Sequence, residues 1–288
     1  MWAQPGPAAT PVSATNSVCK LSDVVIYEDA KFYAAFPSIV RRPDGELLVA
    51  FRRAPDRRKL GEPGITHTDP NSYLVLVRSR DGGKTWSREP QLIFAHPFGG
   101  SQDPCMVQLR DGTILCSSYA WARSEPDAIA RLKQPAARAG DFVFLGGFVF
   151  NETSLYETPK GDLVAFLRTE GFNDHTVIAR SGDHGQSFQW RDAGFQGHPH
   201  HAIRLPDQRV LLVYGYRHPP FGVRARVLDP ECANIGAAEE IVLREDGDNG
   251  DLGYPWATMA SKNRALVVYY FNRADGTRHI AGTFLQIQ

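Results

Sequence analysis

Four of the five leading positions of a recurring sequence pattern carry side chains that transfer protons or attack carbon. The pattern starts five times, 48 to 67 residues apart, and its leading residues are Phe36, Asp103, Glu152, His200 and Tyr254. A phenol beside a base can act as a nucleophile, and histidine exchanges protons near neutral pH. If the copies close into a ring, these five side chains converge near one axis. We therefore expect the functional site at that axis.

The elements that would position these residues are β-hairpins. In each copy the second residue lies eight positions before a turn residue, and an apolar or β-branched run follows; the turn residues are Gly45, Gly112, Gly161, Arg209 and Asn263. A strand, a tight turn and a buried strand make a hairpin. A repeated unit of about 50 residues indicates an array or a propeller.

The remaining strand-like runs extend these hairpins into propeller blades. The first, third and fourth units each carry two further runs, which makes the four strands of a blade. The last unit ends after its third strand, Arg278–Leu285, and the N-terminal run Asp23–Tyr27 has no hairpin of its own. We expect that run to supply the missing strand and close the ring. The second unit is incomplete, with a helix-like segment, Glu125–Arg138, and one apolar run, Phe142–Phe150.

The expected fold is thus an all-β propeller of five four-stranded blades, one of them degenerate, or a shortened form of a six-bladed parent. It would span residues 22–288 after a disordered leader, residues 1–21, that is rich in Pro, Ala and Thr. The leader lacks a charged start followed by an apolar core, so it is not an intact signal peptide, although it could be the stub of one. That reading favours a secreted or periplasmic location.

Composition limits the partners. Lys+Arg and Asp+Glu both total 32, so there is no net field to attract nucleic acid or an anionic membrane. No run approaches the ~18 apolar residues that cross a bilayer. Cys105 and Cys116 face each other diagonally on one expected hairpin, a placement that rarely allows a disulfide. We expect a monomer that binds carbohydrate, without a cofactor or a metal.

Two copies of one short motif indicate the superfamily. Ser79–Trp86 fits S-x-D-x-G-x-T-W at every defined position, and Ser181–Phe188 repeats it with Ser for Thr and Phe for Trp. In this Asp-box the aspartate bonds turn amides, glycine takes a positive φ, and the aromatic residue packs into the blade. The role is structural. On these motifs the chain resembles the sialidase superfamily of Asp-box β-propellers over residues 22–288.

The resemblance implies a retaining glycosidase that acts on a sugar acid, with a tyrosine nucleophile, a glutamate that activates it and an aspartate as acid/base. Tyr254, in Asp251-Leu-Gly-Tyr254-Pro, matches the nucleophile, and Glu152 matches its partner. A neutral phenol is not repelled by the carboxylate of the substrate. Asp69, on the long loop before the third strand, matches the acid/base.

The resemblance also implies three arginines around the substrate carboxylate. Arg168 matches the second, and Arg224 is our assignment for the third, with Arg217 and Arg226 as close alternatives because strand phase is open. The first should stand two residues before Pro37, where this chain has Ala35. Arg52 or Arg53 could reach the site from the neighbouring strand.

The expected function is therefore a retaining exo-glycosidase acting on a terminal, acidic sugar, with Asp103 and His200 on the pocket wall. The absent first arginine and the dense histidines leave a second hypothesis, a uronate-directed lyase or glycosidase in which His200 or His201 transfers the proton. A third is a carbohydrate-binding propeller without catalysis. A Tyr254–Glu152 separation of about 2.6–3.2 Å would favour the glycosidase.

Overall fold

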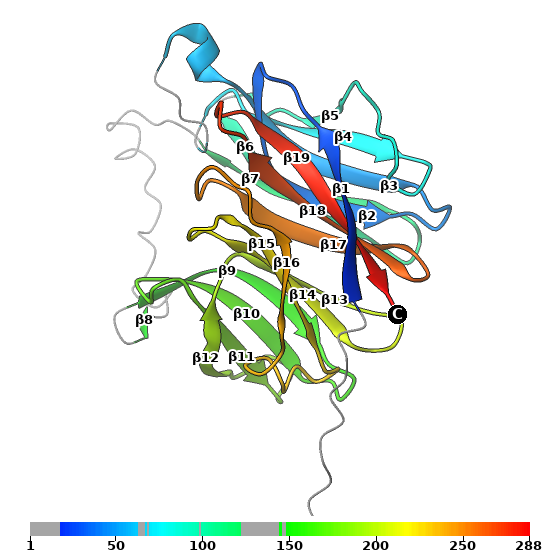
Figure 1. Ribbon diagram of the computed structural model, residues 1–288, viewed down its shortest axis with the longest axis vertical. Coiled ribbons are helices and arrows are strands. Elements are labelled where there is room, and N and C mark those ends of the chain that lie inside the picture. The colour runs from blue at the N-terminus through cyan, green and yellow to red at the C-terminus, as the bar shows by residue number, and fades with distance from the viewer. Residues whose placement is uncertain (1–17, 63–66, 68, 98, 122–143, 146–147) are drawn as a thin grey trace, which may run out of the picture.

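The computed structural model describes residues 18–62, 67, 69–97, 99–121, 144–145 and 148–288. In these residues the chain forms antiparallel β-sheets and one short 3-10 helix, η1 (Arg57–Leu60) (Figure 1). The all-β class expected from the hairpin pattern is confirmed.

Five sheets are described. The first contains β2 (Phe32–Arg41), β3 (Leu47–Pro55), β4 (Tyr73–Ser79) and β5 (Gln91–Phe94). The second contains β6 (Gly100–Gln108) and β7 (Ile114–Trp121), and the third contains β8 (Phe144–Leu145), β9 (Phe148–Glu157), β10 (Leu163–Glu170), β11 (His175–Ser181) and β12 (Gln189–Gln196). The fourth contains β13 (His200–Arg204), β14 (Val210–Tyr216), β15 (Gly222–Leu228) and β16 (Glu240–Arg244). The last has the order β1 (Val18–Tyr27), β19 (Arg278–Ile287), β18 (Arg264–Asn272) and β17 (Gly253–Ser261).

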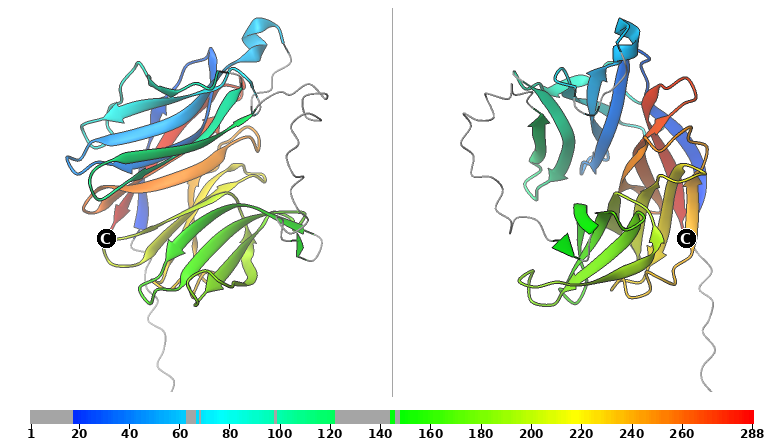
Figure 2. Two further views of the ribbon diagram at one scale, coloured as in Figure 1. Left: turned by 180° about the vertical axis from the view of Figure 1, so that it is seen from behind. Right: turned by 90° about the vertical axis from the view of Figure 1, so that its left-hand side faces the viewer.

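The inner strands of the sheets lie around one axis. β9 contacts β13, β13 contacts β17, β17 contacts β2, and β2 contacts β6. The sheets follow one another around the molecule in the same sequence (Figure 2). A cavity of about 330 Å³ is lined by residues at or beside all five inner strands. The arrangement is propeller-like; a closed ring of five blades remains our prediction.

The last sheet joins both ends of the described chain. β1 pairs with β19 from Val18 opposite Ile287 to Tyr27 opposite Ile280, so the N-terminal run is the fourth strand of this sheet. The strand begins earlier than expected, because Val18 is buried against the core of the last two sheets. The predicted start of the domain at residue 22 therefore lies inside a strand.

The second and third sheets divide the chain differently from our expectation. The helix-like segment Glu125–Arg138 lies outside the described residues. The apolar run that we placed in the second unit contributes instead to the third sheet, where Phe150 pairs with Thr169 of β10. Cys105 lies opposite Ser117 and Cys116 opposite Met106, and both thiols are free.

The core lies between neighbouring sheets. Phe51 of the first sheet packs with Leu266, Tyr270 and Phe284 of the last, and each of the four is almost fully buried. Burial of one such side chain stabilises a fold by about 1.5–3 kcal/mol. This packing holds β17 against β2 and so fixes the spacing of the inner strands.

The first Asp-box has the expected construction. The Asp81 carboxylate accepts hydrogen bonds from the Lys84 and Thr85 amides at 3.0 and 2.9 Å, and Gly82 and Gly83 have positive φ. Trp86 packs against the core. In the second copy Asp183 likewise accepts a bond from the Ser187 amide, but Phe188 is 42% exposed. The prediction that this second aromatic packs into the blade is wrong, because Phe188 belongs to none of the core clusters formed by the described residues.

Candidate active site

Three of the five leading residues have an unusual backbone. Phe36, Asp103 and Tyr254 have φ of 55°, 42° and 49°, a region that non-glycine residues rarely adopt. Each lies where the register of its inner strand shifts by a β-bulge. Bulges re-aim side chains, and such strain gathers at functional sites. Gly253, which precedes Tyr254, has a φ of 109°, a backbone conformation that favours glycine. A Cβ atom built at this position would lie 3.2 Å from the Gly215 Cα.

The structure brings Tyr254, Glu152 and Arg168 together. The Tyr254 hydroxyl donates a hydrogen bond to Glu152 Oε1. Arg168 Nη1 donates to Glu152 Oε2 at 2.7 Å and to the Tyr254 hydroxyl oxygen at 3.3 Å. Burial and the Glu152 charge raise the pKa of Tyr254, against the opposing charge of Arg217. The phenol is therefore protonated at neutral pH, and its proton points at a carboxylate base.

Arg217, rather than Arg224, is the second arginine beside the tyrosine. The Arg217 guanidinium lies 5.3 Å from the centre of the Tyr254 ring, and it donates to the Leu252 carbonyl at 3.0 Å. Arg224 is engaged elsewhere: it bonds the Arg244 carbonyl and stacks 4.8 Å from the Tyr216 ring. Arg217 lies in the connection after β14, whereas Arg224 lies within β15, and the sequence had left the choice between them open.

Arg52 lies opposite Ala35 in the pairing of β2 with β3. Its side chain is fully buried, with the guanidinium 5.7 Å from the centre of the Tyr33 ring and 6.0 Å from that of Phe36. None of its three side-chain nitrogens has a hydrogen-bond partner among the described residues. Arg52 thus approaches the position where the family arginine would stand, with all its donors unused.

Asp69 does not fit the acid/base role that we expected. Its carboxylate is buried and accepts bonds from Arg57 Nε at 2.7 Å and Nη2 at 3.1 Å, and from the Asn71 amide at 2.8 Å. Burial alone would raise the pKa of Asp69, but the Arg57 guanidinium and the Asn71 amide hold it below its usual value. A carboxylate held in this way stays ionised and has no proton to give.

Asp103 has the opposite environment. Its Oδ2 accepts a bond from the Tyr119 hydroxyl at 3.2 Å, while Oδ1 is buried without a hydrogen-bond partner in the described part of the chain. Burial raises the pKa of Asp103 to about 6; the Tyr119 bond opposes this rise, and the Glu152 charge adds to it. This carboxyl can hold a proton near neutral pH.

The two central histidines are enclosed. His200 Nε2 lies 2.8 Å from Thr176 Oγ1, and burial, with the charge of His198, lowers its pKa to about 3. His201 stacks 4.2 Å from Trp256 and accepts from the Ala257 amide, and burial lowers its pKa to about 4. Both border the axial cavity, yet both are neutral at pH 7 and already hydrogen-bonded.

His200 is also not the leading residue of its unit. In the first unit the amide of the turn residue Gly45 donates a hydrogen bond to the carbonyl of the residue three positions earlier. In the fourth unit the amide of Gln208, which has a φ of 74°, makes the equivalent bond. We had taken Arg209 for this turn position. The pattern therefore shifts by one residue, and Pro199 leads the unit.

A second polar cluster, centred on Asp251, escaped the sequence analysis. Asp251 accepts from the Tyr33 and Tyr270 hydroxyls at 2.9 and 3.0 Å and from Arg278 Nε at 2.9 Å, and His67 Nε2 lies 3.0 Å away. Tyr270 in turn contacts the Tyr254 ring at 6.0 Å between centres. Asp251 stands three residues before Tyr254, which is the signal that could have found it.

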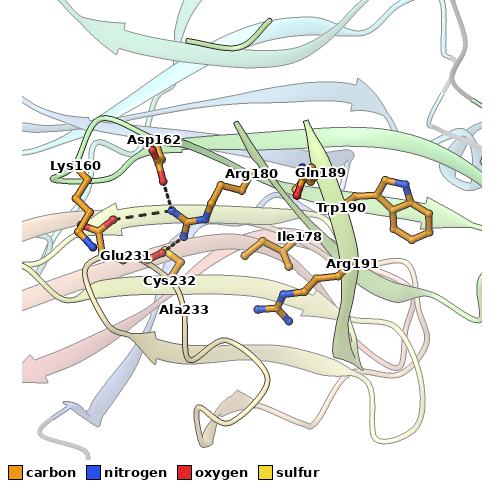
Figure 3. A pocket seen from close by; sticks show the side chains of 11 residues that line it. Lys160, Asp162, Ile178, Arg180, Gln189, Trp190, Arg191, Glu231, Cys232 and Ala233 are labelled. Carbon is orange, nitrogen blue, oxygen red and sulfur yellow. Dashed lines mark hydrogen bonds and ion pairs between the residues drawn. The ribbon is translucent and has the colours of Figure 1, made fainter. Parts of the chain in front are cut away.

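A further cavity, of about 510 Å³, lies at the outer part of the third and fourth sheets (Figure 3). Arg180 crosses it and bonds Asp162 at 2.8 Å, with Lys160 and Trp190 on its walls. No leading residue borders it. The axial cavity, with Tyr254, Glu152 and Asp103 on its wall, is therefore the candidate active site.

No cluster of three His, Cys, Asp or Glu side chains in the described ranges could hold a metal ion. In the same ranges no helix is long and apolar enough to span a membrane.

Antiparallel sheets around one axis, with a Tyr–Glu–Arg cluster at the axial cavity, define a propeller-like protein with a candidate site at the centre. The model of the BNR repeat-like domain matches residues 34–267. The chain belongs to this family, within the sialidase-like superfamily that the Asp-boxes indicated.

One solved structure shows the same architecture. A protein of unknown function from Dyadobacter fermentans is 44% identical, with a TM-score of 0.89, and the match covers 95% of this chain and 100% of that one. A Hadza microbial sialidase is 12% identical, with a TM-score of 0.49 and 88% and 66% of the two chains covered. An endo-arabinase from Bacteroides thetaiotaomicron is 13% identical, with a TM-score of 0.49 and coverage of 90% and 96%. Similarity as low as the last two does not indicate a shared activity. No curated protein sequence matches the chain significantly.

Proposed function

We propose that this protein is a retaining exo-glycosidase that removes a terminal, acidic sugar. The observation that carries the proposal is the hydrogen bonding among Tyr254, Glu152 and Arg168 at the axial cavity. A nucleophile, a base within reach and a third group that orients the base are the arrangement expected for covalent catalysis.

In the first step Glu152 takes the proton of the Tyr254 hydroxyl while the phenol oxygen attacks the anomeric carbon. The bond to the leaving group breaks, and its oxygen receives a proton from an acid. In the second step water attacks the same carbon and gives a proton to the conjugate base of that acid, while the phenol oxygen departs and takes back its proton from Glu152. Two displacements at one carbon retain the configuration.

The cations around the cavity support an acidic substrate. Arg168 and Arg217 flank the tyrosine, and Arg52 lies behind Phe36. Guanidinium groups bind carboxylates through paired hydrogen bonds. A phenol nucleophile fits the same substrate, because a carboxylate nucleophile would repel it.

The test compares wild type with Tyr254→Phe and Glu152→Gln on 4-nitrophenyl glycosides of sialic acid, uronic acids and neutral sugars. We expect each variant to lose roughly 10³-fold or more in kcat while an acidic product still binds, because the nucleophile or its base is removed. NMR of the first-formed product should show the retained anomer. A fully active Tyr254→Phe variant would refute the mechanism.

The alternatives predict different outcomes. A non-catalytic binding protein would bind acidic sugars without turnover by the wild type. A uronate lyase would release an unsaturated product that absorbs in the ultraviolet. The structure gives that version little support, since His200 and His201 are neutral and engaged with Thr176 and Ala257.

A further inference from the structure

We infer that Asp103 is the general acid and base of the reaction, in the place that Asp69 was expected to fill. The inference rests on the proposed function, because a leaving group must be protonated only if a glycosidic bond is broken. It concerns a different residue, however, and can fail while the nucleophile assignment stands.

Asp103 occupies on β6 the position that Tyr254 occupies on β17. Each lies within a register shift of its own inner strand, both have a positive φ, and both border the axial cavity. Glu152 of β9 borders this cavity as well. The nucleophile, its base and the Asp103 carboxyl therefore face one space, in which a sugar could touch all three.

The two oxygens of Asp103 have different surroundings. Oδ2 is held by the Tyr119 hydroxyl of β7, and Oδ1 has no partner among the described residues. One oxygen is thus oriented while the other can carry and deliver a proton. A buried carboxyl oxygen without a donor is costly when it is charged, and this favours the protonated form.

The charged groups that act on Asp103 come from four directions. Burial raises the pKa of Asp103 most, and the charge of Glu152 on β9 adds to this rise. The pKa is lowered by Tyr119 on β7, Arg52 on β3 and His67 before β4, and the result is a pKa of about 6. Because the folded pKa exceeds the usual value, the proton is present below pH 6 and is lost as the pH rises through 6. Asp69, paired with Arg57, cannot supply one in this range.

The proton balance is complete with this assignment. In the first step the Asp103 carboxyl gives its proton to the leaving-group oxygen as the bond from that oxygen to the anomeric carbon breaks. In the second step the Asp103 carboxylate takes a proton from water as the water oxygen bonds to carbon. Asp103 therefore ends each cycle protonated, and Glu152 ends it ionised.

Asp103→Asn and the matched control Asp69→Asn test the inference on two substrates of the same sugar. One carries a methyl leaving group, which needs protonation, and the other carries 2,4-dinitrophenol, which does not. We expect Asp103→Asn to lose about 10²–10⁴-fold in kcat/KM on the methyl glycoside and less than 10-fold on the dinitrophenyl glycoside. Sodium azide should restore turnover of the dinitrophenyl substrate, since azide attacks without a base. Asp69→Asn should treat both substrates alike.

Tyr119→Phe gives a second readout that does not depend on loss of activity. The Tyr119 bond lowers the pKa of Asp103, so its removal should shift the alkaline limb of kcat/KM from about pH 6 to higher pH. An unmoved limb, or a leaving-group effect in Asp69→Asn but not in Asp103→Asn, would overturn the inference and leave the Tyr254 mechanism intact. Full activity of Tyr254→Phe would instead overturn the proposed function.

Discussion

Two buried charged side chains, Asp69 and Arg52, differ in their hydrogen bonding. Asp69 is paired with Arg57 through two hydrogen bonds, whereas the donors of Arg52 are unpaired in the described part of the chain. A buried charge without hydrogen bonds weakens the fold. Arg52 lies 6.0 Å from the ring centre of Phe36, which lines the candidate active site, so we predict that Arg52 binds an anionic group there at a cost in stability.

Arg52→Met should therefore stabilise the free protein, by about 1 kcal/mol or more, because methionine fills a similar volume without a charge. The same variant should lose most of the thermal stabilisation that an acidic sugar confers on wild type. Urea unfolding and thermal shifts with and without glucuronate or sialic acid measure both effects. Arg57→Met is the matched control: it leaves Asp69 buried and unpaired, and should lower Tm. A destabilised Arg52→Met that retains sugar binding would show that Arg52 is structural.

At the scale of elements, the two Asp-boxes differ in how their aromatic residues pack. Both Asp-boxes form the aspartate-centred turn, through Asp81 and Asp183. Only Trp86 reaches the core between the first and last sheets, whereas Phe188 remains at an outer edge. The turn is local, but the packing of its aromatic residue depends on a neighbouring sheet.

We predict that Trp86→Ala lowers the free energy of unfolding by about 2–4 kcal/mol, since it opens a cavity beside the core. Phe188→Ala should change it by less than about 0.5 kcal/mol, as is usual for surface sites. Urea titration followed by circular dichroism compares the two. Equal losses would mean that Phe188 is covered by another part of the protein.

At the scale of the whole molecule, burial keeps four histidines neutral. His198, His200, His201 and His279 all have a pKa lowered to about 3 or 4, chiefly because burial disfavours the charged ring. They come from the fourth and last sheets and the loop before them, so their protonation acts on the fold as a whole.

The free energy of unfolding should therefore fall as the pH drops below 6.5. Below that pH these histidines bind protons in the unfolded chain but stay neutral in the folded protein. Each ring therefore lowers the free energy of unfolding by about 1.4 kcal/mol per pH unit. Asp103 works in the opposite sense between pH 6 and 4 and offsets one of them. We expect a net loss on the order of 8 kcal/mol from pH 6.5 to 4.5, measured by urea unfolding. His200→Gln should flatten this slope by one proton, and a stability independent of pH would contradict the burial.

Local patterns in the sequence determined the strands, the turns and the hydrogen-bond partner of Tyr254. The hairpin signals and the Asp-boxes depend on backbone preferences and on contacts within a few residues, which a sequence shows directly. The leading-residue pattern placed Tyr254 and Glu152 at equivalent positions, and the structure joins them through a hydrogen bond. The resemblance to the sialidase superfamily added their roles.

Only the tertiary structure decided which of several similar residues face the cavity. His200 lies one residue after the leading position of its strand, which Pro199 occupies. Asp103 lies in a β-bulge and borders the axial cavity. Arg217 and Arg224 differ in what the neighbouring strand offers them: Tyr254 and Leu252 for one, the Arg244 carbonyl for the other. Burial shifts the pKa of Asp103 upward, whereas the Arg57 side chain and the Asn71 amide hold the pKa of Asp69 below its usual value, although the two side chains have the same chemistry. These properties depend on atoms brought together from distant parts of the chain, and no local pattern encodes them.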